Sequence, residues 1–283
     1  MKPVIVTDST SNLPPEIVAS YSIPVIPLQI HWGDETYLDG VTLDSDTFYQ
    51  WLKTRRDFPM TSQPSAGEFI NFFKSTAERF QTDTIIGVFI SSQMSGTLAS
   101  AAQAKAELPE LHIELVDSRS VSMGLGFQVL AAVRAAEEGA SPDEILDAIY
   151  RVRASMFVFF TVDTLEYLHR GGRIGGAARF LGTALNLKPL LMLENGRVDT
   201  LEKVRSRRKS LQRLFEVAQE RLSGRAPAEV AVIEVDAAED AEWITAQVME
   251  HLRPKQFYHV RITPVVGTHA GPGALGLVFY PEV

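Results

Sequence analysis

The sequence predicts an α/β protein of two domains, a parallel-sheet α/β domain followed by an α+β domain. First, a chain of 283 residues exceeds the usual size of one compact domain. Second, apolar strand-like runs alternate with helical patterns in the N-terminal half, which is typical of a parallel sheet covered by helices. Third, the pattern changes near residue 155 to a strand, a glycine-rich stretch and a hairpin. We therefore expect domains at 1–155 and 156–283.

Four apolar runs predict the strands of the first domain, at 4–7, 25–29, 84–90 and 111–116. Two helix starts are marked between and after them. Ser65 and Glu68 form a capping-box pattern, in which the serine accepts a helix amide and the glutamate reaches back. Pro142 after Ser141 stands at a first helical position, with acidic residues in the first turn.

The second domain begins with a strand at 156–160. Asn195-Gly196 then separates two apolar runs, 190–193 and 198–204, and predicts a hairpin with a tight turn, because these two residues tolerate positive φ. The remaining pattern predicts, in chain order, a helix at 206–223, a strand at 229–235, a helix at 238–252 and a strand at 258–262.

Composition excludes several classes of protein. The chain has no cysteine, so disulfides, thiolate metal sites and thiol nucleophiles are absent, as suits a reducing cytosol. A net charge of -8 disfavours general nucleic-acid binding. The first residues do not resemble an export signal, and the uncharged stretch 84–104 has a polar centre that would be costly in lipid. We expect a cytoplasmic protein without a membrane span.

Two glycine-rich segments do not predict nucleotide binding. Residues 271–276 match G-x-G-x-x-G, but only seven residues follow, too few for a crossover helix and a second strand. The segment 171–176 has neither that spacing nor a Walker lysine and is interpreted as a helix break. The six histidines are scattered, and no metal-binding motif is present.

Uncharged hydrogen-bond donors gather at two junctions before helices, at 61–65 and 91–97. In an open parallel sheet, ligands bind beyond the carboxyl ends of the strands, where helix amides favour an anion. Hydroxyls and amides together suit a carboxylate, although helix capping alone also explains such residues. A hydrolase remains an alternative, with Ser95, His269 and an acid such as Asp8 or Asp117, but Ser95 lacks the G-x-S-x-G context.

The order and spacing of several motifs over nearly the whole chain resemble the DegV family of fatty-acid-binding proteins, which includes the FakB subunits of bacterial fatty acid kinase. The matching segments are DSTSNL (8–13), TSQPS (61–65), SGT (95–97), SMGLG (122–126), LEYL (165–168), GGRI (171–174) and GTHAGPGALG (267–276). Two positions depart from the family pattern: Ala270 stands where Thr or Ser is expected, and His169 where Lys or Arg is frequent.

The resemblance implies a non-enzymatic protein that holds one long-chain fatty acid, such as palmitate, between its two domains, with no metal or other cofactor. When the family's binding residues are transferred to the matching motifs of this sequence, the carboxylate would be bound by Thr61, Ser62, Ser95, the Gly96 amide and His269. In FakB proteins a separate kinase subunit converts the bound acid to an acyl phosphate, a step of phospholipid metabolism. Catalysis would then belong to that partner.

Basic residues cluster between 203 and 213 without an intervening acid, in a chain that is acidic overall. Such a run is ordinarily a solvated helix face. In a FakB-like protein, Arg205, Arg207 and Arg208 would form a docking patch for the kinase subunit. Segments 157–162 and 180–192 are candidates for lining the acyl chain, with plain core as the alternative. A third possible role is a bound lipid that serves structure or sensing without a kinase.

Overall fold

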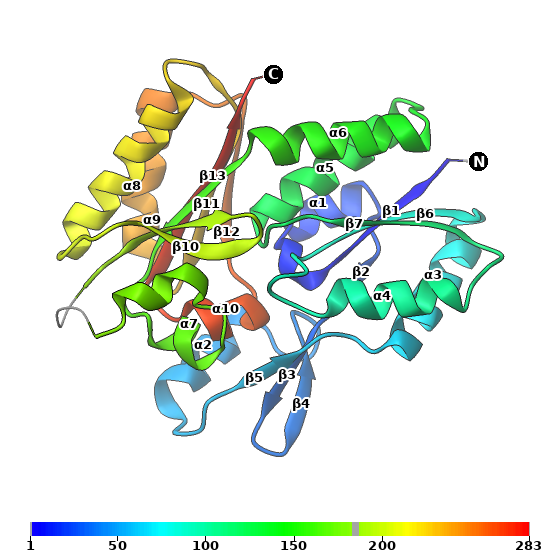
Figure 1. Ribbon diagram of the computed structural model, residues 1–283, viewed down its shortest axis with the longest axis horizontal. Helices are drawn as coiled ribbons and strands as arrows, with labels where there is room; N and C mark the ends of the chain where they lie inside the picture. The colour runs from blue at the N-terminus through cyan, green and yellow to red at the C-terminus, as the bar shows by residue number, and fades with distance from the viewer. Residues whose placement is uncertain (1, 183–186, 283) are drawn as a thin grey trace. The chain divides into compact units, whose positions relative to one another are not determined.

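The computed structural model describes residues 2–182 and 187–282, and the chain divides into two compact units (Figure 1). Unit 1 comprises Met1–Asp44 and Asp57–Ala154, and unit 2 comprises Ser45–Arg56 and Ser155–Val283. The predicted fold class, a parallel-sheet α/β part and a further part with its own sheet, is confirmed. The division differs from a single cut near residue 155, because segment 45–56 belongs to unit 2.

Unit 1 is built on a parallel sheet whose strand order is β2-β1-β6-β7. Its strands are β1 (Val4–Asp8), β2 (Val25–Ile26), β6 (Thr84–Phe89) and β7 (His112–Asp117), close to the four predicted runs. β1 and β6 are central in the sheet and almost wholly buried. Continuous apolar runs are expected for parallel strands that are covered on both faces.

Helices cover this sheet. The helices of unit 1 are α1 (Pro15–Ser20), α3 (Ala66–Phe80), α4 (Thr97–Ala106), α5 (Met123–Glu137) and α6 (Pro142–Ser155), with the 3-10 turn η1 (Ser9–Ser11). Phe69 and Phe73 of α3 and Ala101 of α4 share one apolar cluster with the sheet. The predicted capping box is confirmed: Ser65 Oγ accepts from Glu68 N at 3.2 Å, and Glu68 Oε2 accepts from Ser65 N at 2.7 Å.

Unit 1 also contains a small antiparallel sheet that the sequence analysis did not predict, with strand order β4-β3-β5. Its strands are β3 (Gln29–Trp32), β4 (Glu35–Leu38) and β5 (Met60–Ser62). Ile30 and Trp32 are buried, whereas Gln29 and His31 alternate with them on the other face. The predicted strand at 25–29 is divided between β2 and the first residue of β3.

Helix α2 (Ser45–Thr54) joins unit 2 through specific polar contacts. Tyr49 Oη donates to the carbonyl oxygen of Ile262 at 2.8 Å, and Ser45 Oγ donates to the same oxygen at 3.2 Å. Lys53 Nζ lies 2.5 Å from Asp236 Oδ2. These contacts join residues more than 180 positions apart in the chain, which local sequence patterns do not reveal.

Unit 2 is an α+β unit whose sheet has the order β10-β9-β8-β13-β11-β12. Among the described strands of this sheet, β11 and β12 pair in parallel and the other neighbours pair antiparallel. Its strands are β8 (Phe157–Thr161), β9 (Leu190–Glu194), β10 (Arg197–Glu202), β11 (Pro227–Val235), β12 (Gln256–Arg261) and β13 (Ala274–Pro281). The remaining elements are α7 (Glu166–Arg170), η2 (Gly175–Phe180), α8 (Arg207–Leu222), α9 (Ala238–Gln247), the π-turn η3 (Val248–Leu252) and α10 (Pro264–Ala270).

The predicted hairpin is confirmed by β9 and β10, with Asn195 at φ 49° and Gly196 at φ 80°. Figure 1 shows α8 and α9 beside the sheet of unit 2, and Leu214 and Ile244 lie in one apolar cluster with residues of β8, β11 and β13. Strand β13 was not predicted; it begins at Ala274, within the glycine-rich segment 271–276. β13 pairs with both β8 and β11 and is fully buried.

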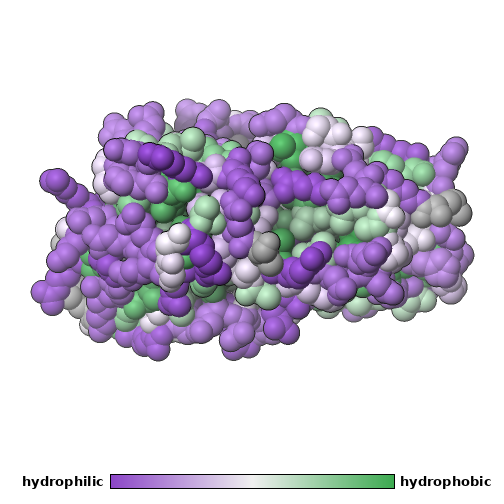
Figure 2. All heavy atoms as spheres, turned by 90° about the horizontal axis from the view of Figure 1, so that it is seen from above, coloured by the Kyte–Doolittle hydropathy of each residue, from purple (hydrophilic) through white to green (hydrophobic). Residues whose placement is uncertain are grey.

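The surface shown in Figure 2 is mostly hydrophilic, with smaller hydrophobic areas between the polar side chains. Within the ranges 2–182 and 187–282, no helix combines the length and the apolar character needed to cross a bilayer.

Removal of one hydroxyl tests the attachment of α2. Tyr49→Phe removes this buried donor while Ser45 Oγ still donates to the Ile262 carbonyl, so the free energy of unfolding should fall by about 0.5 to 1.5 kcal/mol. Urea unfolding followed by circular dichroism measures the change. Tyr150→Phe, at an exposed position of α6, is the control and should unfold like the wild type. Equal stability of all three proteins would contradict this account.

Candidate functional site: a hydroxyl- and amide-lined edge of the parallel sheet

A buried carboxylate joins the ends of two central strands of unit 1. Asp8, the last residue of β1, accepts hydrogen bonds from Thr10 N at 2.9 Å, Thr10 Oγ1 at 2.5 Å and Ile90 N at 2.8 Å. Ile90 directly follows β6 and begins the segment that leads to α4. Asp8 therefore holds the predicted polar segment 91–97 to the turn after β1.

Burial raises the pKa of the Asp8 carboxyl to about 6, because the charged form is desolvated; its hydrogen bonds to Thr10 and Ile90 lower the pKa and only partly offset this effect. The bonds of the other suggested triad acid, Asp117, go to Ser92 and to the backbone of Arg119. Neither acid contacts a histidine through these bonds.

The two predicted polar junctions meet at the start of α4. Ser95 Oγ lies 2.8 Å from Thr97 Oγ1 and accepts from Thr97 N at 3.3 Å, and Gly96 is the N-cap of the helix. A Cβ placed on Gly96 would come within 3.0 Å of Gln63 Nε2. The carboxamide of Gln63 thus packs closely on the Gly96 backbone, and a side chain at residue 96 would require this carboxamide to shift by a few tenths of an ångström.

Thr61 and Ser62 do not point in the same direction. In β5, Thr61 pairs with Ile30 and Ser62 pairs with Gln29, so their side chains lie on opposite faces of the small sheet. Ser62 Oγ is bonded to His31 Nε2 at 2.8 Å and to Gln29 Oε1 at 3.2 Å. This geometry does not support both hydroxyls as ligands of one carboxylate, and it identifies His31 and Gln29 as polar partners that the sequence analysis missed.

His269 lies in α10 of unit 2, and its ring packs on the backbone of Gly171, where a Cβ would overlap Nδ1. Burial, together with the positive charge of Arg173, lowers the pKa of His269 to about 4. The imidazole is therefore neutral at neutral pH. Gly271 packs in the same manner against the ring of Tyr167, so two sequence motifs identified separately, 165–174 and 267–276, are assembled around this histidine.

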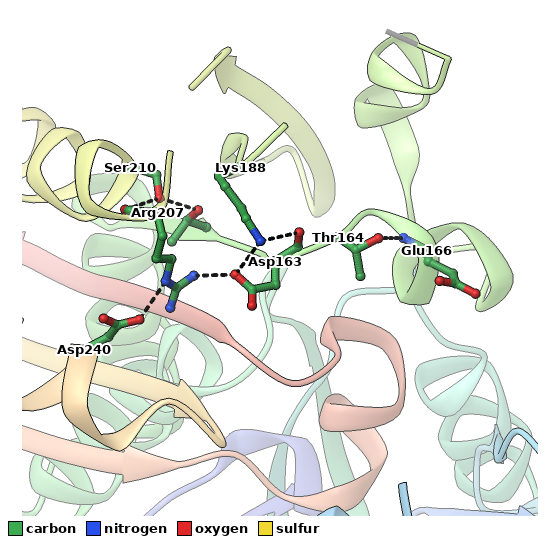
Figure 3. Close-up of polar contacts among 8 residues, drawn as sticks. Asp163, Thr164, Glu166, Lys188, Arg207, Ser210 and Asp240 are labelled. Carbon is green, nitrogen blue, oxygen red and sulfur yellow. Dashed lines mark hydrogen bonds and ion pairs between the residues drawn. The ribbon is translucent and has the colours of Figure 1, made fainter. Parts of the chain in front are cut away.

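The predicted docking residues have different surroundings. Arg207 Nε donates to Asp240 Oδ2 at 2.6 Å, and its Nη1 lies 3.6 Å from Asp163 Oδ1 (Figure 3). Asp163 also accepts from Lys188 Nζ at 3.0 Å. Arg207 is therefore part of a charged network within unit 2.

Arg205 and Arg208, by contrast, are exposed. Of the predicted acyl-lining residues, Phe159 belongs to the apolar cluster under α8 and α9, and 183–186 lie outside the described residues. In the part of the chain that the structure describes, no group of three or more acidic or histidine side chains could hold a metal ion.

These features define an α/β protein in which neutral hydroxyls, amides and a helix N-terminus lie together at one edge of the parallel sheet. Residues 2–282 match a family model described as "Uncharacterised protein, DegV family". The chain is 34% identical over 282 residues to Protein DegV of Bacillus subtilis, covering 98% of both chains. It is 38% identical over 275 residues to a DegV domain-containing protein of Streptomyces coelicolor, covering 97% of this chain and 96% of the relative. The chain belongs to the DegV family.

Solved structures of related proteins superpose on this chain over its full length. A DegV family protein from Thermus thermophilus, described by its fatty acid binding, superposes with a TM-score of 0.94 at 33% identity and full coverage of both chains. DegV from Bacillus subtilis, described as a fatty acid binding protein, gives a TM-score of 0.92 at 33% identity, also with full coverage. A stearic acid-binding protein from Eubacterium ventriosum gives 0.90 at 27% identity, covering 99% of this chain and 98% of that one.

The buried carboxyl of Asp8 predicts a specific pH dependence. Since its pKa rises from 3.8 to about 6 on folding, its contribution to stability is fully present below pH 4 and is lost as the pH rises through 6. The loss amounts to about 3 kcal/mol. Asp8→Asn removes it, so the stability of the variant relative to the wild type should increase between pH 4 and 7.5.

Denaturant unfolding at several pH values measures this difference. Asp34→Asn, at an exposed turn position, is the control and should follow the wild-type profile. A difference between Asp8→Asn and the wild type that does not change with pH would show that the Asp8 carboxyl is not desolvated as described.

Proposed function

We propose that this protein binds one long-chain fatty acid, such as palmitate, and holds its carboxylate at the N-terminus of α4. Thr61, Ser95 and the Gly96 amide are the proposed ligands in unit 1. The observation that carries the proposal is the close packing of Gln63 on Gly96, which brings the two hydroxyl-bearing segments together at a helix N-terminus. Fatty acid binding by related DegV proteins supports the choice of ligand.

Two residues of the predicted site have modified roles in this proposal. Ser62 supports the site from the opposite face of β5, since its hydroxyl is bonded to His31 and Gln29. His269 is proposed as a neutral hydrogen-bond donor to the carboxylate, because its lowered pKa removes the positive charge at neutral pH.

A site of neutral donors fits the energetics of this ligand. Burying about fifteen methylenes at roughly 0.8 kcal/mol each provides about 12 kcal/mol before the costs of ordering and association. The acyl chain therefore supplies most of the affinity, and the head group needs only enough donors to offset its desolvation. Without an ion pair, the carboxylate oxygen remains a competent nucleophile for a later transfer.

We further propose that a separate kinase subunit uses the bound acid, in a cytoplasmic setting where ATP is available. A carboxylate oxygen would attack the γ-phosphorus of ATP, forming the acyl phosphate and releasing ADP. Arg205 and Arg208 are the proposed docking residues. They are exposed at the start of α8, whose first turn contains no acid, and cations at a helix N-terminus oppose its dipole. Their placement is better explained by a partner than by the stability of the helix.

Mass spectrometry of an organic extract of the purified protein tests the ligand, with stoichiometric long-chain fatty acid as the expected result. Ser95→Ala should weaken palmitate binding by about 1 to 3 kcal/mol, because it leaves a buried polar group unpaired. Ser75→Ala, at an exposed position of α3, is the matched control. Absence of lipid, together with hydrolysis of an acyl ester that Ser95→Ala abolishes, would instead favour the esterase alternative.

The docking proposal is tested by the double charge reversal Arg205→Glu and Arg208→Glu. Palmitate affinity should stay unchanged, whereas acyl phosphate formation with the cognate kinase should fall severalfold, because attraction between the proteins is lost. Lys74→Glu, exposed on α3, is the charge-reversal control. Unaltered turnover in the double variant would place docking elsewhere, and absence of turnover with any kinase of the host would favour a sensing role.

A further inference from the structure

A continuous chain of hydrogen bonds crosses one face of the small sheet in unit 1. Thr36 Oγ1 lies 3.0 Å from His31 Nδ1, and His31 Nε2 lies 2.8 Å from Ser62 Oγ. Ser62 Oγ lies 3.2 Å from Gln29 Oε1, and Gln29 Nε2 lies 2.8 Å from Glu68 Oε1. The chain thus connects all three strands of the sheet to the capping box of α3.

The carboxylate of Glu68 determines the direction of every bond in this chain. The hydrogen bonds from Ser65 lower the pKa of Glu68, and an ionised carboxylate only accepts. The Gln29 amide must therefore turn its NH₂ group to Glu68 and its oxygen to Ser62. Because that oxygen also only accepts, Ser62 donates its single hydroxyl proton to it.

The direction of the Ser62 bond then fixes the tautomer of His31. With the Ser62 proton committed to Gln29, the bond between Ser62 and His31 requires a proton on Nε2. The neutral ring then carries no proton on Nδ1, which accepts from the Thr36 hydroxyl. A histidine is suited to this position because one side chain bonds β4 on one side and β5 on the other.

The alternation of β5 connects this chain to the head-group site. Ser62 is held on the face of His31 and Gln29, and its neighbour Thr61 therefore points to the opposite face, where Ile30 is buried. Gln63 follows at once and packs on Gly96. A β5 strand that rotated or slipped by one residue would exchange the two faces and remove the Thr61 hydroxyl from its place.

We propose that His31 is a positioning residue of the head-group site, which holds Ser62 through an Nε2–H donor and thereby keeps the Thr61 hydroxyl directed at the ligand carboxylate. This inference rests on the proposed function, in which Thr61 contacts that carboxylate.

The tautomer is tested without any ligand. ¹⁵N NMR of the histidine rings at pH 8.5, where an imidazole is neutral, should show His31 protonated on Nε2 and not on Nδ1. The ring resonances that are missing from the spectrum of His31→Gln are those of His31. Protonation on Nδ1 would overturn the proposal, because His31 could then only accept from Ser62 and the direction derived from Glu68 would be wrong.

The role in binding is tested by two substitutions of similar size. The amide nitrogen of His31→Gln reaches about as far as histidine Nε2 and keeps the donor, whereas His31→Asn is too short to reach Ser62. The ratio of palmitate affinity to hexadecanol affinity isolates recognition of the carboxylate from binding of the chain. His31→Asn should lower this ratio about fivefold, the effect of weakening one hydrogen bond, and His31→Gln should restore it.

Equal ratios for His31→Asn and the wild type, or failure of His31→Gln to restore a lowered ratio, would overturn the positioning role. Thr61→Val separates this result from a failure of the proposed function. If Thr61→Val leaves the ratio unchanged, the head-group site itself is wrong, and the inference fails with it. If Thr61→Val lowers the ratio, adding His31→Asn should cause no further loss, because His31 acts through Thr61.

Discussion

The close approach of Gln63 to the backbone of Gly96 is the constraint on which the rest of the site depends. It joins two segments that follow different strands, and a side chain at residue 96 would displace the Gln63 carboxamide. Hydroxyls and helix amides are common in α/β proteins, and most serve only as caps. Here the packing of one carboxamide on one glycine brings two such junctions together at the start of α4, where we propose that the carboxylate binds.

Support for this edge comes from two carboxylates that do not touch the proposed ligand. Asp8 is buried beneath it and holds the start of segment 90–97 to the turn after β1. Glu68 caps α3 and, through Gln29, orients the polar face of the small sheet. Both acids have their oxygens occupied by donors of the protein, so each serves to position neighbouring segments of the chain.

The polar groups considered as catalytic candidates are each held by contacts within their own unit. Ser95 shares its hydroxyl with Thr97, and the acids near it are bonded to backbone amides and hydroxyls rather than to an imidazole. His269 is buried and neutral, and it is packed on Gly171.

Local patterns in the sequence determined the strands of the parallel sheet, the caps of α3 and α6, the Asn195-Gly196 turn and the family, because each depends on residues close together in the chain. Only the tertiary structure decided that α2 belongs to unit 2, that β13 is central in its sheet and that Arg207 is held by Asp240. It also decided that Ser62, and not Thr61, shares a face with Gln29 and His31. That outcome depends on the pairing of β5 with β3, about thirty residues earlier, and a shift of one residue in that pairing reverses every side chain.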